Sequence, residues 1–486
     1  MVLQDKDLQS IQEVRNLIGR AKEAQRELST FSQEKIDSII KSMAKAAEEA
    51  SKSLAKKAAE ETGFGKYEDK IIKNLFASKA VYEYIKDMKT VGILKEDKEK
   101  RLMEIASPVG VIAALIPSTN PTSTTIYKSL SALKAGNAVI FSPHPSAKNC
   151  TYETAKLLQE TASRNGAPDG LIGCMTIPTM EGSKELMTHK DVSLILATGG
   201  SAMVKAAYSS GTPALGVGPG NVPAFIEKTA KIPAAVRRII TSKTFDNGTI
   251  CASEQAVVTE TAIANQVREE FMRQGGYFAK EEEAAKLAKT IQNPWGGLNP
   301  KIVGQPAVKI AAMAGIQVPS NTKVILCNEK GVGKDYPFSM EKLSPILAFY
   351  TKDDWHEACE LCIELLKYGG LGHSLVIHSE NEEIIREFAL KKPVFRIMVN
   401  TPSSHGAIGA TTSLAPSLTL GCGSLGGSAT SDNVSPLHLI NIKRLAYGVK
   451  EADELGDEAI QPKQTGDIDI DTITQLVLQE LKNLNI

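Results

Sequence analysis

The feature that most constrains the fold is an alternation of short apolar runs with amphipathic segments, which begins near residue 107. Residues 109–116 form an apolar run ended by Pro117, which is typical of a strand buried on both faces of a parallel sheet. The alternation continues with helical patterns at 124–134, 147–165 and 181–188 and strand patterns at 138–141, 172–177 and 192–197. Such a series predicts a doubly wound α/β sheet.

A second α/β series follows residue 246 and runs to about residue 440. Its strand patterns lie at 257–258, 324–327, 346–350, 375–378 and 398–399. Before the first series, residues 7–90 show apolar residues at three- and four-residue spacing, which predicts helices. We therefore expect a first domain over 1–245, which includes the N-terminal helices, and a second over 246–435.

The C-terminal region differs from everything before it. Residues 451–471 contain eight acids against the single base Lys463, which predicts a solvated linker over 451–468. Beyond it, apolar residues fall on one helical face, widened by Leu476: Ile470, Ile473, Val477, Leu481 and Leu484. An amphipathic helix over 469–486 that follows a linker favours a docking element, and the alternative is a helix packed on its own oligomer.

Composition excludes several classes of partner. The chain has 56 basic and 56 acidic residues, so nothing favours a nucleic-acid or anionic-membrane surface. The N-terminus is not that of a signal peptide, and the apolar runs are too short to span a bilayer. Seven scattered cysteines predict reduced thiols in the cytoplasm. Cys359 and Cys362 form a lone Cys-x-x-Cys in a helical pattern, which leaves zinc or redox chemistry a weak alternative, and we expect no metal.

Cys251 lies in the run TFDNGTICASEQ, where a loop meets the apolar residues 256–258. A thiol in that position can be exposed to a substrate, attack an aldehyde and then leave from a thioester. The alternative is a buried cysteine that acts as a small hydrophobic residue.

Other candidate ligand-binding groups follow predicted strands. Asn120 comes just after the 109–116 strand, where its amide can donate to an oxyanion, although a turn asparagine before proline is the simpler interpretation. Thr198, Gly199 and Gly200 follow the predicted strand at 192–197 and open a helix. The free amides at a helix start suit a pyrophosphate, although ordinary tight turns have the same sequence pattern. Residues 216–221 are rich in glycine but lack the Lys-Ser/Thr of a Walker motif.

Taken together, these segments resemble the aldehyde dehydrogenase superfamily over residues 10–445. The resemblance is closest to the coenzyme A-acylating branch, including the propionaldehyde and acetaldehyde dehydrogenases of bacterial microcompartments. It implies an aldehyde-dehydrogenase-like α/β fold, with Cys251 as the nucleophile and Asn120 as the oxyanion donor. His373, in the loop-like run GGLGHS before a strand, is similar to a histidine proposed to assist proton transfer, although such a histidine is often structural.

The resemblance also implies NAD binding. Glu341 matches the acid that binds the nicotinamide ribose, and Ser142 and His144 stand where hydrolytic relatives have a lysine for the adenosine ribose. His144 can equally be a turn residue. The full set of expected cofactor-binding residues is Ile116, Pro117, Ser118, Ser142, Pro143, His144, Thr198, Gly199, Gly200, Val217, Gly218, Glu341 and Leu343.

The reaction type depends on residues 215–221. Hydrolytic relatives have a glutamate there that activates water, and its counterpart falls near Val217, in a segment without any acid. The resemblance therefore implies ping-pong oxidation of a short aldehyde, with NAD and CoA, to acyl-CoA and NADH. Acetaldehyde, propionaldehyde and a sulfonated aldehyde stay open. The alternatives are a hydrolytic enzyme that releases a free acid and a scaffolding protein that acts through its tail.

The resemblance finally assigns roles to the domains. Residues 1–245 should bind NAD and CoA, residues 246–435 should carry catalysis, and 436–450 with 101–107 should form bridging or oligomerisation strands of a homodimer or homotetramer. Residues 421–427 should border the substrate tunnel, with Leu425 where relatives often have tryptophan. The 469–486 helix resembles targeting helices that bind shell or core proteins of a microcompartment, which predicts a cytoplasmic enzyme enclosed in one.

Overall fold

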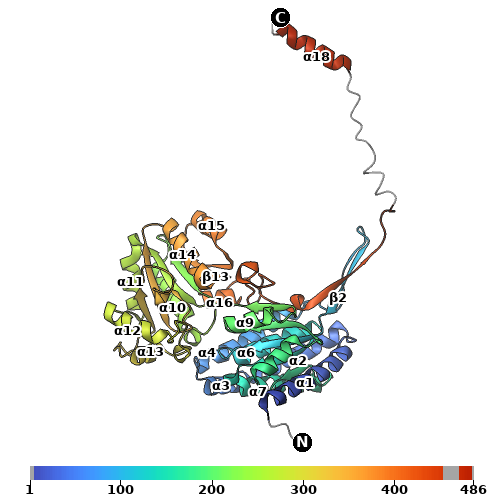
Figure 1. Ribbon diagram of the computed structural model, residues 1–486, viewed down its shortest axis with the longest axis horizontal. Coiled ribbons are helices and arrows are strands. Elements are labelled where there is room, and N and C mark those ends of the chain that lie inside the picture. Colours follow the sequence, from blue (N-terminus) through green and yellow to red (C-terminus); the bar gives the residue numbers. More distant parts are fainter. Residues whose placement is uncertain (1–4, 453–469, 484–486) are drawn as a thin grey trace. The chain divides into compact units, whose positions relative to one another are not determined.

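The computed structural model describes residues 5–452 and 470–483 and divides into two compact units. The larger unit comprises residues 1–92 and 106–441, and the smaller one comprises 93–105 and 442–486. The larger unit contains two parallel sheets, each with its own helices (Figure 1). This is the α/β fold that the alternating sequence pattern predicts.

The first sheet has five parallel strands in the order β5-β4-β3-β6-β7. All six residues of the central strand β3 are buried, which explains its continuous apolar run. The chain moves from β3 outward to β5 and then returns to β6 and β7 on the other side, so right-handed crossovers place the connecting helices on both faces. The strands are β3 (Val111–Ile116), β4 (Ala138–Pro143), β5 (Ile172–Cys174), β6 (Val192–Thr198) and β7 (Ala214–Val217).

The helices around this sheet come from the N-terminal region and from the crossovers. Helix α1 packs on β4 and α8, and α2 packs on α6 and α7. The N-terminal set is α1 (Lys6–Leu28), α2 (Gln33–Glu49), α3 (Ser51–Thr62), α4 (Tyr67–Leu75), the π-helical turn η1 (Phe76–Ala80) and α5 (Val81–Ile85). The crossover set is α6 (Pro121–Lys134), η2 (Pro145–Ala147), α7 (Lys148–Arg164), α8 (Met180–Thr188) and α9 (Ser201–Tyr208).

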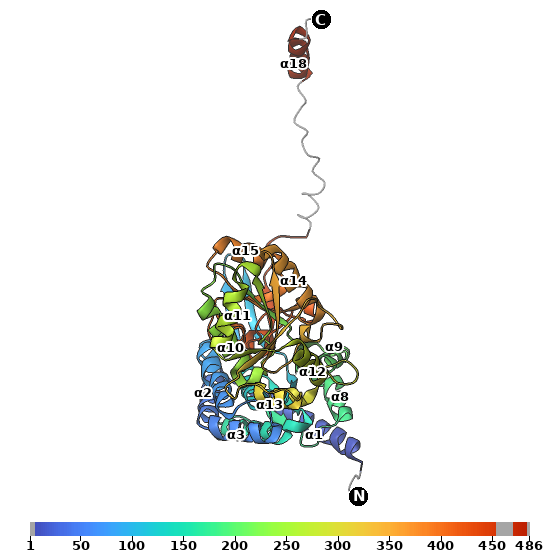
Figure 2. The same ribbon diagram turned by 90° about the vertical axis from the view of Figure 1, so that its left-hand side faces the viewer.

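The second sheet has seven strands in the order β10-β11-β12-β9-β8-β13-β14. Its strands are β8 (Val222–Ile226), β9 (Glu254–Glu260), β10 (Gly276–Phe278), β11 (Val324–Asn328), β12 (Ile346–Lys352), β13 (Gly372–His378) and β14 (Val394–Val399). The longer helices around it are α10 (Ile232–Thr244), α11 (Ala264–Arg273), α12 (Glu281–Ile291), α13 (Ala307–Met313), α14 (Trp355–Gly369) and α15 (Glu382–Lys391). Figure 2 shows α14 and α15 at the end of this unit far from α1, α2 and α3.

Short elements complete the larger unit. The turns are η3 (Phe245–Gly248), η4 (Thr261–Ile263), η5 (Pro300–Ile302), η6 (Pro337–Ser339), α16 (Ser403–Ala407), η7 (Ser424–Gly426) and η8 (Pro436–Leu439). The sheets divide the chain between Val217 and Val222, earlier than the boundary predicted at 245/246. The difference arises because β8 and α10 form the first strand–helix pair of the second sheet, and no change in composition marks that point.

Two predicted strands are shorter than expected, each for a local reason. The first begins at Val111 because Gly110 has a φ of 123°, where the backbone cannot continue a strand. β5 ends at Cys174 because the N–H groups of Thr176 and Ile177 donate to the Glu13 carboxylate instead of to a neighbouring strand.

The smaller unit contains most of a three-stranded sheet in the order β1-β2-β15. The strands are β1 (Gly92–Asp97), β2 (Leu102–Pro108) and β15 (Ile440–Ala446). β2 and β15 fall where strands were expected, whereas β1 was not predicted. The predicted helix is α18 (Ile470–Asn483), in which no residue is buried. The expected linker lies almost entirely outside the described residues.

Candidate active site

A cavity of about 520 Å³ lies at the carboxyl ends of the first sheet. The ends of β3, β4, β6 and β7 line one side, and the turn before β9 lines the other. The chain reverses its direction of winding at β3, so the cavity lies at the switch point where ligands bind in doubly wound sheets.

Nearly all residues predicted to form the site line this one cavity. They include all thirteen residues expected to bind cofactor, together with Cys251 and Asn120. His373 is the one predicted site residue that does not line it. Segments as distant in sequence as Ile116 and Leu343 therefore converge on one space.

Cys251 lies in the turn between η3 and β9 and is the only one of the seven cysteines that is not buried. Its surroundings nevertheless disfavour the thiolate. Removal from water raises the pKa of the thiol to about 12, and the nearby charges of Glu341 and Cys422 add to this shift. The resting thiol is therefore protonated and requires a proton acceptor during reaction.

Within the described part of the chain, Glu341 is the only carboxylate that lines the cavity. Its Oε1 accepts a hydrogen bond from the Gly220 N–H at 3.0 Å. Burial raises the pKa of this carboxyl to about 7, against the opposing effects of that hydrogen bond and of Lys243 and Lys342. Its charge can therefore change within the neutral range.

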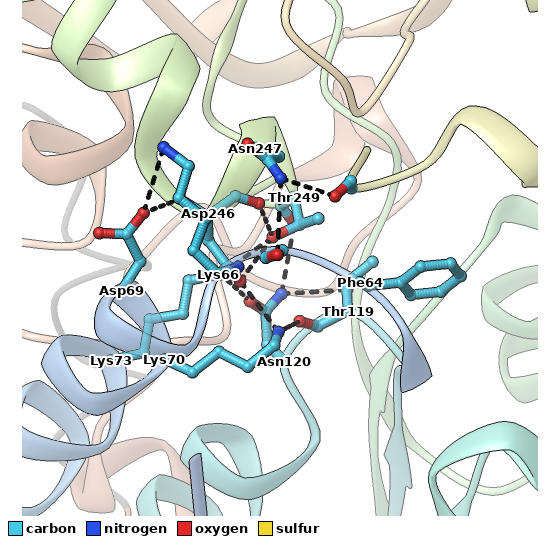
Figure 3. Close-up of polar contacts among 12 residues, drawn as sticks. Phe64, Lys66, Asp69, Lys70, Lys73, Thr119, Asn120, Asp246, Asn247 and Thr249 are labelled. Carbon is cyan, nitrogen blue, oxygen red and sulfur yellow. Dashed lines mark hydrogen bonds and ion pairs between the residues drawn. The ribbon is translucent and has the colours of Figure 1, made fainter. Parts of the chain in front are cut away.

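Asn120 precedes the first residue of α6, and its side-chain amide is held on both sides (Figure 3). Its Oδ1 accepts from Lys73 Nζ at 2.5 Å, and its Nδ2 donates to Thr119 Oγ1 at 3.0 Å and to the Thr249 carbonyl at 3.3 Å. One N–H therefore faces the Thr249 carbonyl in the segment that leads to Cys251, and the other faces Thr119, both at the wall of the cavity. An oxyanion in the cavity would take one of these N–H donors in place of its present acceptor.

Sequence reasoning missed the buried ionic cluster behind Asn120. Lys70 and Lys73 of α4 both contact the Asp246 carboxylate, and all three side chains are at most 3% exposed. Lysine is rarely buried without such partners, so the helical spacing of Lys70 and Lys73 gives no reason to expect them in the interior. No sequence motif indicates this cluster, because α4 and η3 are more than 170 residues apart.

The cofactor end of the cavity is built from strand ends and a helix start. Thr198 ends β6 and Gly200 immediately precedes α9, so the first N–H groups of that helix face the same edge. The hydroxyl of Ser142 lies 2.9 Å from that of Ser183. His144 is exposed and accepts from the Ser146 N–H at 3.2 Å, so it caps the turn η2 as well as lining the cavity.

His373 lies elsewhere than predicted. It is the second residue of β13 rather than part of a loop, and it is fully buried. Burial, followed by the charge of Arg396, lowers its pKa to about 3, and among the described residues its Nε2 has no hydrogen-bond partner. The His373 ring and the Cys251 backbone both lie beside Gly220: a Cβ on Gly220 would lie 3.2 Å from His373 Cε1 and 1.9 Å from the Cys251 carbonyl oxygen.

The cavity also has an apolar wall that was largely unpredicted. None of the described residues that line the cavity is lysine or arginine. The predicted 421–427 segment does not line it: Leu425 is exposed, and the preceding Leu418 and Leu420 line the cavity instead. The wall comprises Phe64, Ile250, Leu298, Pro300, Val303, Leu343, Ile408, Leu418 and Leu420.

The family model for the aldehyde dehydrogenase family matches residues 3–276, which is more than half of the chain. The chain belongs to the aldehyde dehydrogenase family. A crystal structure of an acetylating aldehyde dehydrogenase from Geobacillus thermoglucosidasius is 57% identical, with a TM-score of 0.91 over 92% of this chain and 99% of that one.

Two further members of the family are similar to this chain over most of its length. A propionaldehyde dehydrogenase from the fucose utilisation microcompartment of Clostridium phytofermentans is 31% identical, with a TM-score of 0.82 over 90% of this chain and 98% of that one. The bifunctional aldehyde-alcohol dehydrogenase of Escherichia coli (strain K12) is 48% identical over 90% of this chain but only 50% of its own length. The chain thus spans about half the length of such curated relatives.

Two other observations concern metal binding and membrane insertion. Cys359 and Cys362 are both buried in α14, and the described residues contain no group of three or more side chains placed to hold a metal ion. Within the described ranges, no helix is both long and apolar enough to cross a membrane.

Proposed function

We propose that the protein is a CoA-acylating aldehyde dehydrogenase that oxidises a short aldehyde with NAD and CoA to acyl-CoA and NADH. The observation that carries this proposal is the composition of the cavity around Cys251. The thiol shares the cavity with an oriented Asn120 amide, and the only carboxylate there, Glu341, is bound to the Gly220 N–H. No acid occupies residues 215–221, where hydrolytic relatives have their base.

The strand-end side of the cavity suits a dinucleotide. Thr198 Oγ1 is buried without a partner among the described residues, and the N–H groups at the start of α9 are available to a phosphate. Glu341 and Thr198 would bind the nicotinamide half, and Ser142 and Pro143 the adenosine half. Bound there, NAD accepts the hydride that leaves the aldehyde carbon.

The chain's own groups supply the rest of the chemistry. Cys251 attacks the aldehyde carbon, its thiol proton passes to a base, and the Asn120 N–H groups stabilise the oxyanion. Loss of hydride leaves a thioester on Cys251. The CoA thiol then attacks that thioester, the Cys251 sulfur leaves, and acyl-CoA is released.

The apolar wall narrows the choice of aldehyde. A sulfonate or carboxylate on the substrate would need a cationic partner when it is removed from water, and no lysine or arginine is among the described residues that line the cavity. Side chains such as Phe64 and Leu418 would instead contact a short alkyl group. We therefore favour acetaldehyde and propionaldehyde over a sulfonated aldehyde.

The deciding experiment is the dependence of NADH formation on CoA with acetaldehyde and propionaldehyde. We expect a burst of at most one NADH per site without CoA and sustained turnover with it, accompanied by acyl-CoA. Sustained CoA-free turnover that yields the free acid would reject the proposal in favour of hydrolysis, with Glu341 as the available base. No NADH under either condition would reject both.

We further propose that the C-terminal helix directs the enzyme into a bacterial microcompartment. The apolar residues of α18 are 43–75% exposed, so its apolar face is available to a partner of the shell or core. A fluorescent protein fused to residues 451–486 should concentrate in shells of the same source. Val477→Asp with Leu481→Asp should abolish that localisation, whereas Gln475→Asp on the opposite face should not. Diffuse fluorescence of the unaltered fusion would reject the targeting role.

The small sheet is proposed as an oligomerisation element of a homodimer or homotetramer. Its strands β2 and β15 are tied at one end by the Tyr447 N–H, which donates to the Arg101 carbonyl at 3.1 Å. Light scattering of the intact chain should give two or four copies. If truncation at residue 450 changes that number, α18 packs on its own oligomer instead of a shell.

A further inference from the structure

We propose that Lys73 is a positioning residue that fixes the orientation of the Asn120 amide, so that its nitrogen faces the Thr249 carbonyl in the loop that carries Cys251. The inference rests on the proposed function, in which Asn120 is the oxyanion donor. Lys73 lies on α4, is 3% exposed and does not line the cavity, so it would act through Asn120 and not on the substrate.

The number of hydrogen bonds at the Lys73 nitrogen indicates whether it is an ammonium or a neutral amine. Nζ donates to Asn120 Oδ1 at 2.5 Å, to Thr249 Oγ1 at 3.0 Å and to the Asp246 carboxylate. An ammonium has three N–H donors and no acceptor, so these three acceptors use all of them. A neutral amine has only two N–H donors, so it could make all three contacts only by accepting from the Thr249 hydroxyl, which donates to Asp246 instead.

A donor-only group decides which way an asparagine amide points. If the Asn120 amide were rotated by 180°, its NH₂ would face the Lys73 ammonium, and its oxygen would face the Thr249 carbonyl (Figure 3). The rotated amide would therefore oppose donor to donor on one side and acceptor to acceptor on the other. Lys73 and the Thr249 carbonyl together select the orientation in which Nδ2 is directed at the nucleophile segment.

The same ammonium also holds the segment that carries the nucleophile. Asp246 and Asn247 have φ values of 48° and 53°, a left-handed conformation that non-glycine residues adopt at a cost. Contacts from several elements hold this turn: the Asp246 N–H donates to Asp69, its Oδ1 accepts from the Lys66 N–H, and Asn247 donates to the Gly304 carbonyl. Thr249, two residues before Cys251, contacts both Asp246 and Lys73.

Lys70 supplies an internal control for this arrangement. It contacts the same Asp246 oxygen at 3.1 Å, but its other contact is the Thr119 carbonyl at 3.3 Å and not Asn120. Loss of either lysine removes one ion-pair partner of Asp246. Only the loss of Lys73 removes the donor that orients the Asn120 amide.

The test is a double-mutant cycle between Lys73→Met and Asn120→Ala, measured on the first turnover of NADH formation. We expect Asn120→Ala to slow that step about 10²–10³-fold, the usual effect of one oxyanion donor. Lys73→Met should slow it by about 10–100-fold with unchanged NAD affinity, and it should add less than about threefold in the Asn120→Ala background. Lys70→Met should lower the melting temperature as much as Lys73→Met does. It should slow the first turnover less than Lys73→Met, and its fold-change should be the same in the wild-type and Asn120→Ala backgrounds.

Three outcomes would overturn the inference: multiplicative effects of Lys73→Met and Asn120→Ala, equal kinetic effects of Lys73→Met and Lys70→Met, or a change that appears only in NAD affinity. If Lys73→Met is recovered only as aggregate, Lys73→Gln, which keeps N–H donors, enters the same cycle with the same expected non-additivity. If wild-type protein and all variants lack activity with aldehyde, NAD and CoA, the proposed function fails. If Asn120→Ala is slow and Lys73→Met is normal, only the role of Lys73 fails.

Discussion

Gly220 offers a direct test of how tightly the Cys251 turn is held. A Cβ built on Gly220 would lie 1.9 Å from the Cys251 carbonyl oxygen and 2.9 Å from its carbonyl carbon. Carbon and oxygen in contact are normally about 3.3–3.6 Å apart, so Gly220→Ala must move the Cys251 backbone or its own by more than about 1 Å. A displacement of that size in a reacting group costs about 10²-fold in rate. We therefore expect kcat to fall at least about 100-fold, with about 1–3 kcal/mol of lost stability from overpacking.

The assay is steady-state NADH formation with saturating aldehyde, NAD and CoA, together with thermal melting and NAD titration. Gly19→Ala is the control for the added methyl group, since a Cβ at Gly19 in α1 meets nothing within 4 Å, and it should be neutral or slightly stabilising. If folded Gly220→Ala turns over within about threefold of wild type, the turn is not rigidly held, and the geometry assigned to Cys251 is wrong.

Three further predictions concern the reactivity and the charge state of the Cys251 thiol. Cys251→Ser should abolish aldehyde oxidation while NAD still binds in titrations, because a hydroxyl is a far poorer nucleophile and leaving group; near-normal turnover would remove Cys251 from the mechanism. Because the pKa of Cys251 is raised to about 12, alkylation by iodoacetamide should become about tenfold faster per pH unit between pH 7 and 10, without a plateau. Glu341→Gln removes a negative charge that raises this pKa, so it should speed alkylation at any fixed pH in that range; a plateau near pH 9 in wild type, or no change in the variant, would contradict this account of the thiol.

The architecture could be predicted because the strands of a doubly wound sheet have a local signature. The apolar run before Pro117 is buried on both faces and ends where the cavity begins, as its composition indicates. Asn120 and Thr198 could be proposed for the same reason, because residues that follow neighbouring parallel strands meet at one sheet edge. The positions that strand order predicts for these residues therefore agree with their positions in the structure.

Residues off the sheet edge were harder to place. The pattern around His373 indicated a loop, but the residue is the second of β13, which begins at Gly372 with a positive φ. The apolar wall is assembled from six separate segments, and each of its residues resembles an ordinary core residue in sequence. Whether His373 takes part in proton transfer stays a prediction, since it is buried and does not line the cavity that contains Cys251.

Lys73 shows most clearly what sequence reasoning cannot supply. On α4 the run EDKIIKN has the charges of an exposed helix, and helical spacing alone gives no reason to bury a lysine. Its burial depends on Asp246, which is 173 residues away in the sequence, and on the left-handed backbone that turns that carboxylate inward. Removal of this lysine would leave Lys70 as the one lysine that contacts Asp246 and free the Asn120 amide to rotate, so one substitution would disturb both the proposed oxyanion donor and the turn that carries Cys251. Burial of the lysine charge opposes folding, so the position of Lys73 is better explained by the proposed role of its Asn120 partner than by stability alone.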